Sequence, residues 1–190
     1  FYDEALALMK SQDLSAFDLS LEPDEVREKY GKGSKFGQGC LLARRLIERD
    51  VRCVEVIKGG WDSHNEMPEE KARDLDQGLA ALMQDLADRG LLDSTIVVVA
   101  TEFGRNPLLK EELGRDHWAK AFSCLIGGGG IKTGQVIGAT DRGHEPITEK
   151  TLIPDLHSTI GQAMGMPIKK VIMSDSGRPF NVGYKGTPIA

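Results

Sequence analysis

Polar side chains that could bind a metal ion follow two apolar stretches of the sequence. Asp62 and His64 come after the stretch Val51–Ile57, and Glu102 comes after the stretch Thr95–Ala100. In an extended loop, residues two apart point the same way, so Asp62 and His64 place a carboxylate beside an imidazole. Imidazole nitrogen and carboxylate oxygen together suit zinc, manganese or iron. These three residues are therefore candidate metal ligands.

A third polar loop contains Asp116 and His117, between Gly114 and Trp118. Adjacent residues of an extended chain point opposite ways, so one of the two faces the metal, and we favour His117. Asp116 is kept as a candidate ligand, with the alternative that it orients a ligand through a hydrogen bond. The full candidate set for a divalent metal is Asp62, His64, Glu102, Asp116 and His117. Zinc is the first choice, with manganese, iron or calcium as alternatives.

Simpler interpretations of these residues stay open. An Asp-x-His pair is common by chance, and Glu102 is also explained as a surface carboxylate paired with Arg105. His157 lies within an apolar helical pattern, which indicates a structural role. His144 belongs to a polar loop and is either at the rim of a site or simply solvated.

The elements that must position these side chains are predicted from hydrophobic periodicity. Helices are expected at Tyr2–Lys10, from Pro23 onward, at Phe36–Arg49, from Pro68 to Gly90 and at Ile153–Met164. Strands are expected at Val51–Ile57, Thr95–Ala100 and Ala121–Ile126. The strand–helix–strand order between residues 51 and 100 predicts a βαβ unit with parallel strands. The β-branched run at 95–100 is typical of a strand buried on both faces.

These elements predict an α/β fold with helices flanking a mostly parallel central sheet. Residues 1–50 are expected to be a helical lead-in that packs on the sheet. Residues 51–190 are expected to be the α/β metal-site portion of the same domain. The chain begins with Phe1 rather than Met, so we expect it to be part of a longer protein.

Composition argues against nucleic-acid binding, a membrane span and a disulfide framework. The 190 residues include 24 Lys and Arg against 29 Asp and Glu, without a basic run, so nucleic acid is not an expected partner. The longest apolar run, Thr95–Ala100, is far shorter than the ~20 residues of a membrane span. The three cysteines, Cys40, Cys53 and Cys124, are unclustered and lie in apolar stretches. They are predicted to be buried core thiols rather than disulfides or a Cys-x-x-Cys site.

Five blocks, in order along the chain, carry a resemblance to a known family. They are Phe36–Leu46, Gly60–His64, Thr101–Arg105, Gly114–Trp118 and Gly134–Thr140. They resemble a sulfatase-like bacterial family of unknown function within the alkaline phosphatase superfamily. The resemblance implies the C-terminal portion of an α/β/α sandwich, with metal at the strand ends and hydrolysis of sulfate or phosphate esters.

The resemblance also implies roles for particular residues. Asp62 and His64 look like the superfamily's first metal-binding pair, and His117 looks like its late histidine. Glu102 falls where the aspartate of the second pair would be, while Phe103 stands where the superfamily's phosphatases carry a histidine. The superfamily's nucleophile belongs to an N-terminal half, which would be a partner of this chain.

Under this hypothesis Arg105 and Arg115 are catalytic, because guanidinium groups stabilise the charged oxygens of an ester by bidentate hydrogen bonds. The expected substrate is a small-molecule or polysaccharide ester, and the expected location is periplasmic or extracellular. Phe103 in place of a ligand supports an alternative, a non-catalytic, metal-stabilised domain that binds sugars or polymers. A structural α/β domain without metal is a third interpretation.

Overall fold

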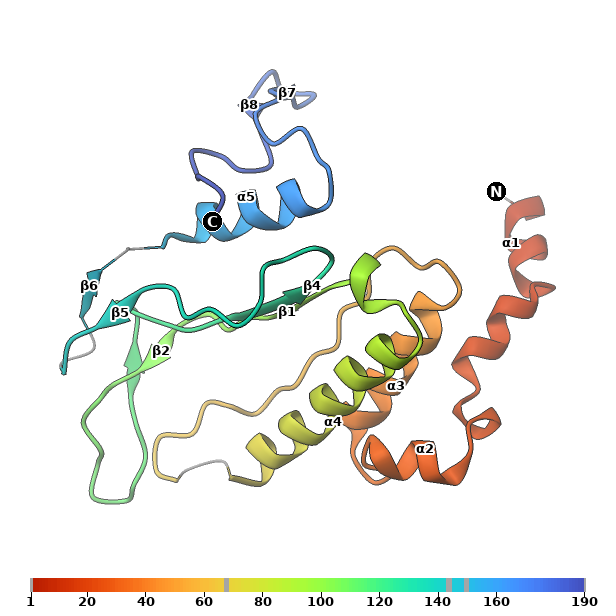
Figure 1. Cartoon of the computed structure of the whole chain (residues 1–190), viewed down its shortest axis with the longest axis horizontal. Coiled ribbons are helices and arrows are strands. Elements are labelled where there is room, and N and C mark those ends of the chain that lie inside the picture. The colour runs from red at the N-terminus through yellow and green to blue at the C-terminus, as the bar shows by residue number, and fades with distance from the viewer. Residues whose placement is uncertain (1, 67–68, 143–144, 149–150, 190) are drawn as a thin grey trace. The chain divides into compact units, whose positions relative to one another are not determined.

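The computed structural model describes residues 2–66, 69–142, 145–148 and 151–189 (Figure 1). The chain divides into two compact units. The first consists of residues 1–63 and 67–90, and the second of residues 64–66 and 91–190. The candidate histidines His64 and His117 both belong to the second unit.

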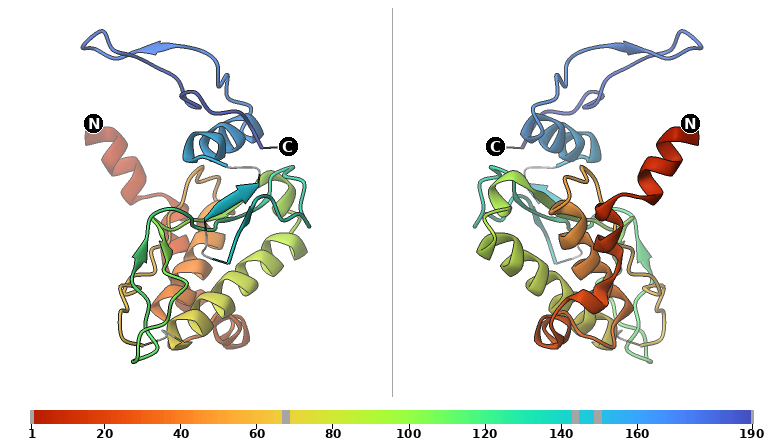
Figure 2. Two further views of the ribbon diagram at one scale, coloured as in Figure 1. Left: turned by 90° about the vertical axis from the view of Figure 1, so that its left-hand side faces the viewer. Right: turned by 90° about the vertical axis from the view of Figure 1, so that its right-hand side faces the viewer.

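The first unit is helical. Its elements are α1 (Tyr2–Met9), the 3-10 helices η1 (Gln12–Phe17) and η2 (Leu19–Leu21), α2 (Asp24–Lys29), α3 (Lys35–Ile47) and α4 (Glu69–Asp88). Helices α3 and α4 lie side by side in both orientations of the molecule (Figures 1 and 2). The buried core between and beside them consists of Tyr30, Phe36, Cys40, Leu41 and Ala81. These elements confirm the predicted helices of this part of the chain.

Local sequence explains where α3 and α4 begin. The Ser34 side chain accepts a hydrogen bond from the Gly37 amide at 2.9 Å, which caps the first turn of α3. The first turn of α4 carries Glu69 and Glu70, whose charge is favourable near the positive end of the helix macrodipole. A Cβ on Gly37 would lie 1.7 Å from the Tyr30 carbonyl oxygen, so only glycine permits the tight approach of these segments.

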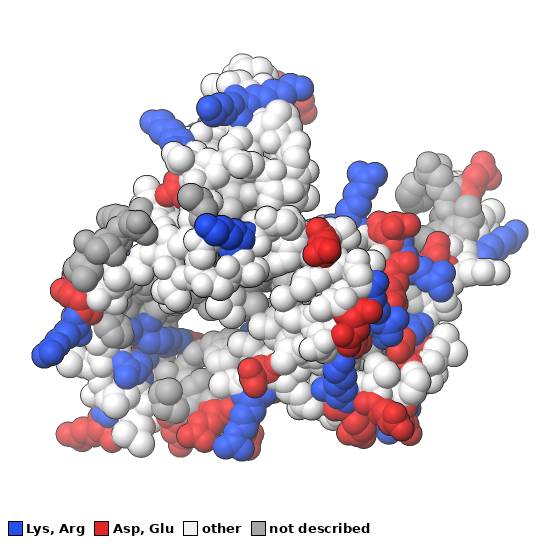
Figure 3. Space-filling model, viewed as in Figure 1, with Lys and Arg blue, Asp and Glu red and all other residues white. Residues whose placement is uncertain are grey.

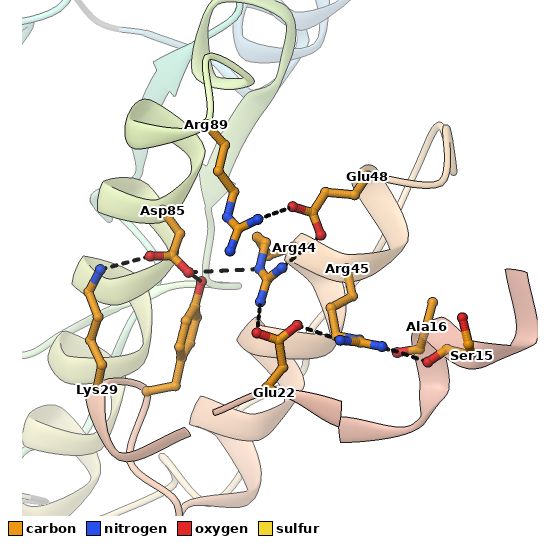
Figure 4. A network of polar contacts seen from close by, with 10 residues as sticks. Ser15, Ala16, Glu22, Lys29, Arg44, Arg45, Glu48, Asp85 and Arg89 are labelled. Carbon is orange, nitrogen blue, oxygen red and sulfur yellow. Dashed lines mark hydrogen bonds and ion pairs between the residues drawn. The ribbon is translucent and has the colours of Figure 1, made fainter. Parts of the chain in front are cut away.

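A buried polar network connects the helices of this unit (Figure 4). The Arg44 side chain is 2% exposed and lies 2.7 Å from carboxylate oxygens of both Glu22 and Glu48. Its Nε lies 3.7 Å from Asp85, which accepts a hydrogen bond from the Tyr30 hydroxyl at 3.0 Å. The network therefore joins α3, α4 and the segment before α2 through charged side chains.

The second unit contains short strand pairs and one helix. Its strands are β1 (Ile96–Val99), β2 (Gly104–Arg105), β3 (His117–Trp118), β4 (Leu125–Gly128), β5 (Ala139–Thr140), β6 (Pro146–Thr148), β7 (Ile172–Met173) and β8 (Pro179–Phe180). The 3-10 helix η3 (Leu92–Ser94) precedes β1, and α5 (Ile153–Ala163) follows β6. The predicted helix at 153–164 is confirmed by α5.

The expected sandwich with a mostly parallel central sheet is wrong. Within the described part of the chain, the strands form four antiparallel pairs, β1–β4, β2–β3, β5–β6 and β7–β8. The predicted run at 95–100 does contain β1, but β1 pairs antiparallel with β4, and Val98 is 36% exposed. The predicted strand Ala121–Ile126 is displaced, because β4 begins at Leu125 and continues through Gly128.

The predicted strand Val51–Ile57 is also absent from the described residues, and with it the βαβ unit. Residues 53–58 alternate between exposed and half-buried positions, as in a strand, but form no ladder. An apolar alternation favours an extended chain, whereas a strand also requires a neighbour for its amides and carbonyls. Periodicity alone does not identify that neighbour or its direction.

Burial tests the expectation for the cysteines, and helix length and composition are a separate finding. Cys40 is buried as predicted, and burial raises the pKa of its thiol to about 11, but Cys53 is exposed, so that prediction is wrong. Among the helices in the described ranges, none combines the length and the apolar character needed to cross a membrane.

Candidate metal centre

The structure brings three of the predicted ligands together. One ligand atom from each of Asp62, His64 and His117 lies within 4.8 Å of the other two. Asp62 precedes His64 by two residues in the same loop, while His117 comes from β3. We call these three residues the Asp-His-His cluster.

The hairpin of β2 and β3 positions His117. Arg105 on β2 is opposite His117 on β3. The loop between the strands is held by arginine side chains that donate to backbone carbonyls. Arg115 bonds to the oxygens of Asn106 and Pro107 at 2.7 and 2.6 Å, and Arg105 bonds to the Arg115 oxygen at 3.1 Å. Both guanidinium groups therefore contribute to the shape of the hairpin.

Gly114 allows the His64 loop to approach this hairpin. A Cβ at position 114 would lie 1.8 Å from the His64 carbonyl oxygen and 2.4 Å from the Asn65 nitrogen. Both contacts are far shorter than van der Waals distance, and Gly114 is buried. Glycine is the one residue type that fits here without moving His64 or the hairpin.

Aromatic contacts orient the imidazole rings. The ring centroids of His64 and His117 are 4.9 Å apart with an interplanar angle of 42°. In a second ring contact, the centroids of the Phe103 and His117 rings are 4.3 Å apart with an interplanar angle of 37°. Phe103 is half-buried, so its ring limits how far the exposed His117 side chain can rotate.

Asp116 contacts His64 but is not a member of the cluster. One of its carboxylate oxygens lies 2.8 Å from Nδ1 of His64 and 2.6 Å from Nζ of Lys110. Hydrogen bonds from Lys110 and then from His64 lower the pKa of the Asp116 carboxyl below its ordinary value. Of the two predicted roles for Asp116, the geometry matches the hydrogen-bonded one.

The donor set and spacing fit a divalent transition metal. Ligands that share a zinc ion at ~2.1 Å lie roughly 3–3.5 Å apart in tetrahedral geometry. A separation of up to 4.8 Å therefore closes around an ion after side-chain shifts of about 1 Å. Asp62 and His117 are exposed and His64 is half-buried, so such shifts do not require the core to move.

The other candidate residues have different positions. Glu102 is exposed and lies outside the Asp-His-His cluster. His157 is exposed on α5, and His144 lies outside the described residues. The prediction missed Lys110, and it gave Gly114 and Phe103 no part in positioning the histidines. The position of Gly114, two residues before Asp116, was a signal for a close backbone approach.

Comparisons with known proteins correct the resemblance stated above. No sulfatase or alkaline phosphatase family matches the chain, so assignment to that superfamily is wrong. No curated protein and no solved structure matches it either. The family that does match is described as a protein of unknown function, DUF1501, and its match covers residues 1–190. The chain therefore belongs to the DUF1501 family.

Proposed function

We propose that the chain binds one divalent metal ion through Asp62, His64 and His117, and that it hydrolyses a sulfate or phosphate ester there. The observation that carries the proposal is the convergence of the three ligand atoms within 4.8 Å. Two imidazoles and one carboxylate are a donor set of hydrolytic zinc sites, which keep a further position open for substrate or water. Zinc is therefore the first choice of metal.

A divalent ion in such a site polarises an ester oxygen and lowers the pKa of bound water. The residues of the chain supply the rest of the arrangement. His64 and His117 hold their rings in place through contacts with Asp116 and Phe103. The exposure of Asp62 and His117 leaves room for a substrate to approach from solvent.

A second candidate function is metal-dependent binding without catalysis. It is favoured by the hydrogen bonds of Arg105 and Arg115, since both guanidinium groups donate to backbone carbonyls of the hairpin. A guanidinium that holds a loop has fewer donors for the oxygens of an ester. Under this alternative, the ion orders the loops around a binding surface for a sugar or polymer.

A substrate screen separates the two candidates. The zinc-loaded chain is assayed with a chromogenic phosphate monoester, a phosphate diester and a sulfate ester. Hydrolysis predicts turnover of at least one ester class, lost in the double variant His64→Ala/His117→Ala and retained in His157→Ala. His157 is a matched control because it is an exposed histidine on α5 outside the cluster. Turnover that survives in the double variant, or no turnover of any ester by zinc-loaded protein, contradicts hydrolysis at this site.

A further inference from the structure

His64 has two ring nitrogens, and the structure shows what one of them does. Nδ1 lies 2.8 Å from a carboxylate oxygen of Asp116. A carboxylate is an acceptor only, so Nδ1 must carry the hydrogen of this bond. In the neutral imidazole, Nε2 is then the unprotonated nitrogen, and it is the one able to ligate a metal.

The carboxylate of Asp116 is also held by a lysine. Nζ of Lys110 lies 2.6 Å from the same carboxylate oxygen that contacts His64. Lys110 is part of the β2–β3 loop, where its amide donates to the Gly114 oxygen at 3.0 Å and its oxygen accepts from the Leu113 amide at 3.0 Å. The backbone of Asp116 is fixed too, since its oxygen accepts a hydrogen bond from the Asn106 amide at 2.8 Å.

We propose that Lys110 and Asp116 are positioning residues that set the tautomer of His64 and direct its Nε2 toward the metal. This inference rests on the proposed metal site and adds the residues that prepare it. Carboxylates that hydrogen bond to a ligating histidine fix its ring orientation and raise its basicity as a ligand. Lys110 keeps the carboxylate in place through the shared oxygen, and the hairpin loop carries both residues.

The test compares variants of the whole chain by nitrogen-15 NMR and by zinc titration. Long-range nitrogen–proton correlations distinguish the two tautomers of His64 in metal-free protein, at a pH where the imidazole is neutral. Wild type is expected to show Nδ1 protonated. Asp116→Ala is expected to show a mixture of tautomers and to lose about 10–100-fold in zinc affinity.

Two variants refine the assignment. Asp116→Asn keeps an oxygen that accepts from Nδ1, so it should retain the wild-type tautomer and lose less zinc affinity than Asp116→Ala. Lys110→Met should weaken zinc binding by less than Asp116→Ala, because the contact with His64 remains. Asp175→Ala, an exposed aspartate in the turn between β7 and β8, is the control and should match wild type in both measurements.

The outcomes separate this inference from the proposed function. A wild-type tautomer together with wild-type zinc affinity in Asp116→Ala overturns the positioning role. If the wild-type chain takes up no zinc, the metal proposal fails, while the tautomer comparison in metal-free protein still decides whether Asp116 sets the state of His64. A general loss of folded structure would shift histidine signals across the chain, whereas a positioning role changes those of His64.

Discussion

His64 is fixed by contacts on several sides, which explains how a ligand on a long loop acquires a defined orientation. Asp116 contacts Nδ1 of His64, and the His117 ring lies beside the His64 ring. Gly114 lies against the backbone oxygen of His64. Each contact comes from the β2–β3 hairpin or its loop. The position of His64 is therefore set by contacts between residues 64–66 and one hairpin, both in the second unit.

The steric role of Gly114 gives a prediction at this scale. Gly114→Ala adds a methyl group 1.8 Å from the His64 carbonyl oxygen, so either the loop or the hairpin must move. We expect a loss of about 1–3 kcal/mol in unfolding free energy and weaker zinc binding. Urea titration and zinc titration measure the two effects. Gly33→Ala is the matched control, because a Cβ at Gly33 meets nothing within 4 Å. Equal stability and equal affinity for the two variants would contradict the close-approach argument.

At the scale of elements, the packing of α3 against α4 combines an apolar core with a buried charged network. Tyr30 contributes to both, since its ring is in the core and its hydroxyl donates to Asp85. Arg44 faces three carboxylates, those of Glu22, Glu48 and Asp85. Removing Arg44 takes one cation away from all three carboxylates, and breaking a buried ion network costs more than the intact network contributes.

Arg44→Met is therefore expected to destabilise the first unit by about 3–5 kcal/mol. The variant removes the charge and keeps an apolar side chain of similar length. Arg73→Met is the control, because the Arg73 side chain is 81% exposed and lies 3.8 Å from that of Glu69, which is 76% exposed. We expect that control to change stability by about 0–1 kcal/mol. Similar unfolding free energies for both variants, by urea titration with circular dichroism, would show that the buried network has no special weight.

Some of these elements could be predicted from the sequence and others could not. Helices α3, α4 and α5 were predictable, because their periodicity and starting residues are local properties. The strand pairing was not, since β1 pairs with β4 across the 25 residues 100–124, and no local pattern specifies that choice. Asp62, His64 and His117 were identified by residue type and loop position. The role of Lys110 depended on the fold of the hairpin loop and had no sequence signal of its own.

At the scale of the whole molecule, the charge distribution bears on whether nucleic acid is a partner. The net charge is −5, and Figure 3 shows acidic and basic side chains interspersed over the helices of the first unit. The face seen there presents no broad basic field for a phosphate backbone. That nucleic acid is not a partner remains a prediction, and the mixed surface charge is its physical basis.

Stability of the whole chain should depend on pH through the buried carboxylates. Burial by itself would raise the pKa of Glu22 and of Asp85, but hydrogen bonds and nearby positive charges lower both pKa values. For Glu22 the groups that lower the pKa are Arg44 and Arg45. For Asp85 they are Lys29, Tyr30 and Arg44. A carboxyl group with a lowered pKa in the folded state stabilises the fold above its unfolded-state pKa. That stabilisation is lost as the pH falls through the folded-state pKa.

We therefore expect the unfolding free energy to be nearly constant above about pH 5 and to fall progressively below about pH 4, the ordinary range of these groups. Urea titrations at a series of pH values measure it. Arg44→Met should show a shallower decline, because Glu22 and Asp85 each lose one of the cations that favour their charged forms. The same decline in wild type and Arg44→Met would contradict this assignment.

The central claim is that Asp62, His64 and His117 bind one metal ion, and elemental mass spectrometry tests it most directly. Wild type, His64→Ala/His117→Ala and His157→Ala are loaded with zinc and dialysed identically. We expect one zinc ion per chain in wild type and in His157→Ala, and none in the double variant. Zinc retained by the double variant, or absent from wild type, would contradict it.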